Sequence, residues 1–169
     1  MNDPSVFNAP WGTLLKAVTG MSILVLVGVP VIGVLSGPHE DSFWILGMVV
    51  MPLAILVGGA FFMIRGYVLT QDSLTIQRLG WCSRVDLSGL QSVEADGQAM
   101  SRSIRTCGNG GLFCFAGAFR NRKLGAYRAF ATDPKRSVVL RFPNRTVVVT
   151  PDQPEAFIAR VKELTNPRT

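Results

Sequence analysis

The chain opens on two long segments that carry no charge: AVTGMSILVLVGVPVIGVL at residues 17–35 and FWILGMVVMPLAILVGGAFFMI at residues 43–64. At a helical rise of about 1.5 Å per residue, each segment reaches roughly 30 Å, the thickness of the hydrocarbon core of a bilayer. A helix satisfies its own backbone hydrogen bonds, as hydrocarbon requires. The two segments therefore predict transmembrane helices at about residues 14–35 and 43–64.

Two alternatives to a membrane hairpin are a cleaved signal peptide and a buried core helix. The first twelve residues contain no Lys or Arg, and no A-x-A pattern follows the first segment, which argues against a signal peptide. Two such segments also exceed what one small soluble core can bury. Small residues in both segments would let the two helix backbones approach closely. These residues are Gly20, Gly28, Gly33, Gly47, Ala54, Gly58 and Gly59.

Positive charge flanks the two segments on one side only. Lys16 precedes the first segment and Arg65 follows the second, whereas the loop 36–42 contains no Lys or Arg. Cytoplasmic loops of membrane proteins are enriched in Lys and Arg. We therefore expect a protein of the inner or plasma membrane that spans it twice, with both termini in the cytoplasm and the loop outside.

The remainder of the chain is polar and basic. Of the seventeen Lys and Arg side chains, sixteen lie beyond residue 64. Charged residues make up 17% of the chain and apolar residues 48%, whereas a typical soluble domain has about 25% charged residues. This composition excludes a wholly soluble protein. It predicts a membrane hairpin at residues 1–65 and one cytoplasmic domain at residues 66–169.

Short alternating segments separated by turn residues predict that this second domain is rich in β-strands. A helix at residues 153–165 should follow, because Phe157, Ile158, Val161 and Leu164 form one apolar stripe. About seven strands and one terminal helix predict a small barrel or sandwich with a helix plug. The expected strand segments are 66–70, 74–79, 82–87, 90–95, 112–120, 126–132, 138–142 and 146–150.

Several stretches of this domain form a distinctive pattern. They are YVLTQDSLTI at residues 67–76, RTCGNGGLF at 105–113, GAFRN at 117–121, LGAYRAFAT at 124–132 and VVVTPDQPEAF at 147–157. The pattern resembles membrane-anchored bacterial pleckstrin-homology-like (PH-like) proteins. The resemblance implies two transmembrane α-helices followed by an all-β PH-like barrel or sandwich of about seven strands, capped by a C-terminal α-helix. It implies little about activity. The main alternative is a membrane-tethered OB-type barrel, which has five strands and usually lacks the final helix.

The densest basic cluster is RNRK at residues 120–123, in an expected loop between two strands. Arg105 and Arg128 would join Arg120, Arg122 and Lys123 if the strands pair. Guanidinium groups suit phosphate, so these five residues are our candidates for contact with anionic lipid head groups or a partner. The alternative is a generic attraction of about 1 kcal/mol for each cation near an anionic leaflet, without any pocket. We expect no nucleic-acid partner, because the chain is tethered and lacks an aromatic RNA-binding motif.

The glycine-rich run at Gly108, Gly110 and Gly111 does not fit a phosphate-binding loop. Such a loop needs Lys and then Ser or Thr after its last glycine, and here Leu112 follows. We expect these glycines to form a structural turn or bulge with positive φ.

The residue inventory predicts no catalytic residue, no cofactor and no metal. The chain contains one histidine, His39, which falls in the expected external loop beside Glu40 and Asp41. The three cysteines form no CxxC pair.

The function that follows is a non-enzymatic interaction module. It would present a PH-like domain at the cytoplasmic leaflet and bind a protein partner or the anionic lipid surface. The alternative is an accessory subunit of a membrane transporter or membrane enzyme complex. The oligomeric state is left open at this stage.

Overall fold

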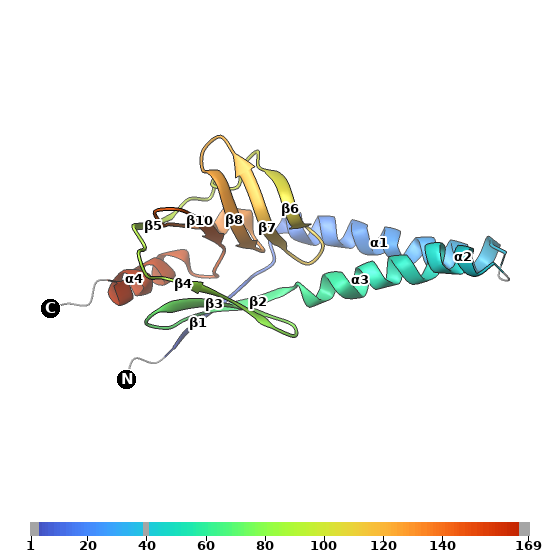
Figure 1. The fold of residues 1–169 in the computed structure, drawn as a ribbon, viewed down its shortest axis with the longest axis horizontal. Helices are drawn as coiled ribbons and strands as arrows, with labels where there is room; N and C mark the ends of the chain where they lie inside the picture. Colours follow the sequence, from blue (N-terminus) through green and yellow to red (C-terminus); the bar gives the residue numbers. More distant parts are fainter. Residues whose placement is uncertain (1–3, 39–40, 166–169) are drawn as a thin grey trace.

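The computed structural model describes residues 4–38 and 41–165. Figure 1 shows a long helical arm that joins a β-rich body at one end. The elements in chain order are β1 (Ser5–Asn8), α1 (Thr13–Ser36), α2 (Ser42–Ile45), the π-helical turn η1 (Leu46–Val50), α3 (Met51–Phe61), β2 (Ile64–Leu69), β3 (Ser73–Arg78), β4 (Cys82–Asp86), β5 (Ser92–Ala95), β6 (Ile104–Gly110), β7 (Phe115–Asn121), β8 (Gly125–Ala131), the 3-10 turn η2 (Pro134–Arg136), β9 (Val138–Arg141), β10 (Thr146–Val149) and α4 (Pro154–Thr165).

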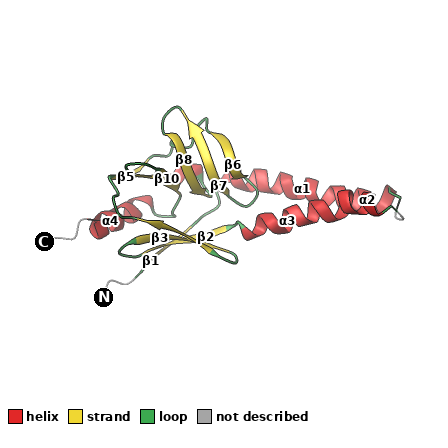
Figure 2. Ribbon diagram, in the orientation of Figure 1, coloured by secondary structure: helices red, strands yellow, loops and turns green. Residues whose placement is uncertain are grey.

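The arm consists of α1 and of the returning helix formed by α2, η1 and α3 (Figure 2). Both helices are long and apolar enough to cross a membrane. In the most apolar 18-residue stretch of α1, only 17% is buried inside the structure, and in the corresponding stretch of the returning helix only 6%. A core helix of a soluble protein would be mostly buried, so this packing argues against that alternative. In the connecting loop, His39 and Glu40 lie outside the described residues.

The π-helical turn in the returning helix has a local cause. Pro52 has no N–H group and its ring clashes with the carbonyl four residues before it. The helix widens just ahead of this proline, where the N–H of Met51 donates to the carbonyl of Leu46, five residues earlier. A π-turn is one of the recognised ways in which a helix absorbs such a disruption.

The glycines of the arm do not all serve the helix–helix contact expected from the sequence. Gly33 does, since a Cβ there would lie 2.8 Å from Cβ of Met48. Gly59 instead meets Leu112 of the body. At the other four, a Cβ added to the backbone would have no neighbouring atom within 4 Å, so their faces of the arm are open; they are Gly20, Gly28, Gly47 and Gly58.

The body contains two sheets, of four and six strands, so the expected single barrel of about seven strands is wrong, whereas a β-rich body with a C-terminal helix is confirmed. One sheet has the order β1-β2-β3-β4 and the other has the order β5-β9-β10-β8-β7-β6. All neighbours are antiparallel except β8 and β10, which pair in parallel. No strand pair joins the two sheets within residues 4–38 and 41–165, so the barrel does not close.

Two strands that the sequence did not predict account for much of this difference. Strand β1 lies before the first apolar helix, inside the segment expected to belong to the membrane hairpin, and pairs with β2 from Ser5 opposite Leu69 to Asn8 opposite Gly66. Strand β6 contains the glycine-rich run. Glycines are typical of turns, so the sequence predicted a turn or bulge there and not a strand. The boundary expected at residue 65 therefore does not separate the sheet from the arm.

The main core lies between the two sheets and is covered by α4. Leu74, Ile76, Val138 and Leu140 contribute to it together with Phe157 of α4. The terminal helix, expected at residues 153–165, occupies Pro154–Thr165. Its amphipathic stripe is what seals the open side between the sheets.

A second core cluster lies on the opposite face of the larger sheet. It contains Phe115, Phe119 and Tyr127 of the sheet together with Leu15 from the first turn of α1. The start of α1 is thus part of the body, and the arm is continuous with the folded domain.

Candidate functional site

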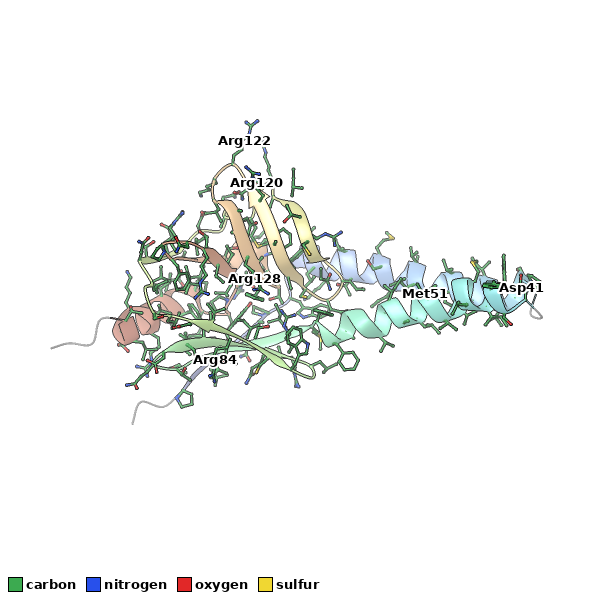
Figure 3. The ribbon with its side chains drawn as sticks, viewed as in Figure 1. Asp41, Met51, Arg84, Arg120, Arg122 and Arg128 are labelled. Carbon is green, nitrogen blue, oxygen red and sulfur yellow. The ribbon has the colours of Figure 1, made fainter. Side chains whose placement is uncertain are left out.

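The structure separates the five predicted basic residues into three places. Arg122 and Lys123 lie at the tip of the β7–β8 hairpin, where Figure 3 shows Arg122 pointing away from the body. Lys123 forms an ion pair with Asp96, and this contact holds the pKa of the Asp96 carboxyl below its usual range. Arg105 lies on β6 and donates to the carbonyl of Gly108 at 3.1 Å.

Arg120 and Arg128 form the third group, on neighbouring strands β7 and β8. They share the face of the larger sheet that looks toward the smaller one, because Phe119 and Tyr127 occupy the opposite face. Figure 3 shows Arg128 between the two sheets. Both side chains line a groove of about 720 Å³ that lies between β3–β4 and β7–β8.

Arg78 forms the buried end of this groove. Only 7% of the residue is exposed. Its Nη1 donates to the carbonyl of Phe62 at 2.9 Å, and its guanidinium carbon lies 4.4 Å from the ring centre of Trp81. Nε is buried without a hydrogen-bond partner in the described part of the chain. Burial lowers the pKa of Arg78, yet a guanidinium stays protonated in proteins, so the groove holds a permanent buried charge.

The remaining lining of the groove combines basic and polar residues with small residues and with aromatic residues such as Phe62, Trp81 and Phe130. Arg145 enters from the β9–β10 turn, where its Nη2 donates to the carbonyl of Asp86 at 2.8 Å. Gly117 and Ala118 of β7 form part of the floor. No Asp or Glu lines the groove among the residues that the structure describes. The groove is therefore an electropositive site with four arginines and no carboxylate.

Sequence reasoning missed Arg78, Arg145 and Trp81. For Arg78 a signal was present, because Leu74, Ile76 and Arg78 alternate along β3 and two-residue spacing places them on one face. Leu74 and Ile76 belong to the core, so the side chain of Arg78 is expected to face inward as well. The β9–β10 turn that carries Arg145 gives no such signal, since only the tertiary fold brings it to the groove.

The groove adjoins the place where the arm enters the body. The last carbonyls of α3 lack partners within the helix and receive donors from the body instead. The indole Nε1 of Trp81 donates to the carbonyl of Phe61 at 3.1 Å. The thiol of Cys114 donates to the carbonyl of Phe62 at 3.1 Å, and burial raises the pKa of this thiol to about 11. Cys114 is thus a neutral structural donor.

The glycine-rich segment holds the other helix of the arm. The hydroxyl of Thr19 in α1 donates to the carbonyl of Gly111 at 2.9 Å and accepts from the N–H of Phe113 at 3.1 Å. Asn109 shapes the same loop, because its Oδ1 accepts from the N–H of Leu112 at 3.0 Å. We name the contact of Thr19 with residues 109–114 the Thr19 clasp.

The three glycines predicted to form a turn have different positions. Gly108 and Gly110 lie within β6, and Gly111 lies in the turn after it. Gly108 (φ +104°) faces Gly117 (φ +138°) across the β6–β7 pair, where a Cβ on Gly117 would lie 2.2 Å from the carbonyl oxygen of Cys107. The run therefore allows two backbones to approach closely.

No His, Cys, Asp or Glu cluster suited to a metal occurs in the described residues.

Comparison with known families agrees with this architecture. The family model described as Bacterial PH domain matches residues 65–165, more than half of the chain. The chain belongs to the bacterial PH domain family. The PH domain of this chain thus includes both sheets except β1, together with α4. No curated protein and no solved structure matched the chain.

Proposed function

We propose that this chain is a membrane-anchored, non-enzymatic interaction module. The arm spans the inner or plasma membrane twice and presents the PH domain at the cytoplasmic leaflet, with both termini in the cytoplasm. There the domain binds a protein partner or the anionic lipid surface. Arg120, Arg128 and Arg145 of the groove, with Arg105, Arg122 and Lys123 outside it, supply the positive contact surface.

The observation that carries this proposal is the set of hydrogen bonds that attaches the PH domain to the end of the arm. The Thr19 clasp holds α1, and Trp81, Arg78 and Cys114 hold the end of α3. A domain on a flexible tether would sample many orientations, whereas this one keeps its groove in a fixed relation to the arm. A groove lined by arginines and by no carboxylate among the described residues, held beside the arm, suits attraction to an anionic leaflet.

A photo-crosslinking amino acid at Ala118 tests the proposal in the full-length chain. Ala118 is exposed and lines the groove, so irradiation of native membranes should give a discrete protein or lipid adduct from this position. The matched control is Ser88, which is exposed but lies outside the groove. Equal adduct patterns from the two positions would contradict a functional groove.

The open glycine faces of the arm favour a second candidate, an accessory subunit that packs against a larger membrane protein. Small residues at helix faces permit close helix packing in membranes, and a Cβ added at Gly28 or Gly58 would have no atom of the described residues within 4 Å. A crosslinker at the exposed Leu24 of α1 should then capture another integral membrane protein. Capture of this chain alone would indicate a homo-oligomer and count against the accessory subunit.

A further inference from the structure

We propose that the groove between the two sheets is a binding site for a phosphate group, anchored by Arg78 and Arg128. This inference rests on the proposed function and names the chemistry of the ligand that its surface takes. Two sources of this chemistry are a phospholipid head group and a soluble phosphate.

The first argument is the unbalanced burial of Arg78. A buried charge is costly unless it is paired and hydrogen-bonded, and residues 4–38 and 41–165 place no carboxylate within ion-pair distance of Arg78. One of its nitrogens is used by the carbonyl of Phe62, and Nε has no partner. The faces of the Trp81 and Phe130 rings attract the guanidinium group of Arg78, but they do not neutralise its charge.

The second argument is the gathering of further cations around the same space. Arg120, Arg128 and Arg145 line the groove with Arg78. Like charges at close range repel each other, and a dianionic or monoanionic phosphate between them relieves that repulsion. Guanidinium groups bind phosphate through two parallel hydrogen bonds, which makes arginine better suited to this ligand than lysine.

The third argument is the size and lining of the space. A volume of about 720 Å³ falls within the usual range of small-molecule sites, roughly 300–1,000 Å³. Ser83 and Thr146 also line the groove, and a hydroxyl group can donate to a phosphate oxygen. Thr106 lines it as well, but its hydroxyl already donates to the carbonyl of Ala118 at 3.0 Å. Phe62 and Trp81 at one end place the groove beside the last turn of α3, where a lipid phosphate would lie if the arm spans the bilayer.

The test uses the full-length chain in an uncharged detergent at constant ionic strength. The probes are inorganic phosphate and phosphatidylglycerol, with chloride and phosphatidylcholine as their controls. A ligand that binds only the folded state raises the unfolding temperature in a saturable way. We expect saturable stabilisation by at least one of the two probes and none by the controls. Stabilisation by phosphate identifies a soluble anion as sufficient, and stabilisation by phosphatidylglycerol alone identifies the lipid as the source.

Three variants separate this site from generic positive charge. Arg128→Gln removes one anchor from an exposed position and should weaken binding about tenfold or more. Arg78→Lys keeps the charge and a donor for the carbonyl of Phe62, but it loses the planar fork and should also weaken binding about tenfold. Arg84→Gln is the matched control, because Arg84 is exposed and basic but lies outside the groove and outside the proposed contact surface, and its affinity should stay within about twofold of wild type.

The outcomes that overturn the inference are distinct from those that overturn the proposed function. Equal weakening by Arg128→Gln and Arg84→Gln, or no saturable shift from either probe, rejects the phosphate site. If the crosslinker at Ala118 still gives its adduct in that case, the interaction module stands without a phosphate site. A phosphate-dependent shift of the wild type that only the groove variants weaken, without any adduct at Ala118, keeps the site and rejects the interaction module.

Discussion

Tyr67 links the two sheets through a hydroxyl that is fully buried. The hydroxyl donates to the carbonyl of Phe130 at 2.6 Å and accepts from the N–H of Thr150 at 3.2 Å. Tyr67 belongs to the smaller sheet, whereas Phe130 belongs to the larger one. Burial raises the pKa of Tyr67 to about 12, against the opposing effect of the hydrogen bonds with Thr150. The contact that Tyr67 makes between the two sheets therefore depends on its hydroxyl remaining protonated.

Alkaline pH should destabilise the body through Tyr67. The folded state keeps the proton up to about pH 12, whereas an unfolded tyrosine loses it near pH 10. The stabilising contribution is complete below pH 10 and falls as the pH rises toward 12, by at most about 1.4 kcal/mol per pH unit. Denaturant unfolding at pH 9 and pH 11 measures this slope, and Tyr67→Phe should flatten it.

Tyr127→Phe is the control for this titration. Tyr127 is the second tyrosine of the chain, and burial raises its pKa as well, but its hydroxyl bonds to Ser103 and does not join the two sheets. Its variant should keep the larger part of the slope. An unchanged slope in Tyr67→Phe would show that the alkaline loss comes from other groups.

At the scale of single elements, the Thr19 clasp belongs to a loop of the body that contacts both helices of the arm. The loop after β6 reaches α1 through Thr19 and reaches α3 through Leu112, whose side chain fills the space beside Gly59. Trp11 adds an aromatic contact to Phe113, with ring centres 6.1 Å apart. The helices of the arm are thus held by the same six-residue segment of the body.

Replacement of Thr19 by Val should loosen this segment. Valine has a similar shape but no hydroxyl, so the carbonyl of Gly111 and the N–H of Phe113 lose their partner. The cost is about 1–3 kcal/mol for buried groups left unsatisfied, and amide hydrogen exchange at Phe113 should accelerate by one to two orders of magnitude. Thr19→Ser keeps the hydroxyl and should retain most of the protection. Slow exchange in both variants would mean that packing alone holds the loop.

Elements with a local signal could be predicted from the sequence, and elements that depend on distant partners could not. The apolar runs are marked by their length and lack of charge, and the alternation in Leu74–Ile76 and the stripe of α4 each repeat with the period of their own element. Strand β1 has only four residues and pairs across sixty positions, so nothing nearby marks it. Thr19 looks like an ordinary helix residue until the fold brings Gly111 to it. The groove has the same character, because its arginines come from separate strands and turns.

On the scale of the whole molecule, β1 ties the beginning of the chain to its end. Phe7 packs edge-on against Phe157 of α4, with ring centres 5.2 Å apart. Asn8 is bonded to the carboxylate of Asp152 through its N–H and its side-chain amide, each at 3.2 Å. The smaller sheet therefore needs residues from both sides of the arm, and residues 66–169 by themselves lack one of its strands.

Removal of residues 1–8 from the full-length chain should lower the stability of the body. Strand β2 would lose its hydrogen-bonded neighbour and α4 would lose the Phe7 ring, at a combined cost of roughly 2–5 kcal/mol. Thermal unfolding in detergent, followed by far-UV circular dichroism, measures the loss. Removal of residues 1–4 leaves β1 whole and should change the midpoint little. A body that melts at the same temperature without residues 1–8 would show that β1 is dispensable.

The position of β1 also sets an order of events during synthesis. The ribosome releases Ser5–Asn8 first, yet their partner strand Ile64–Leu69 emerges only after both helices of the arm have been made. The four-stranded sheet therefore cannot assemble ahead of the arm, and an incompletely translated chain exposes an unpaired strand. A delay in translation at this step would leave the nascent body exposed to quality-control proteases.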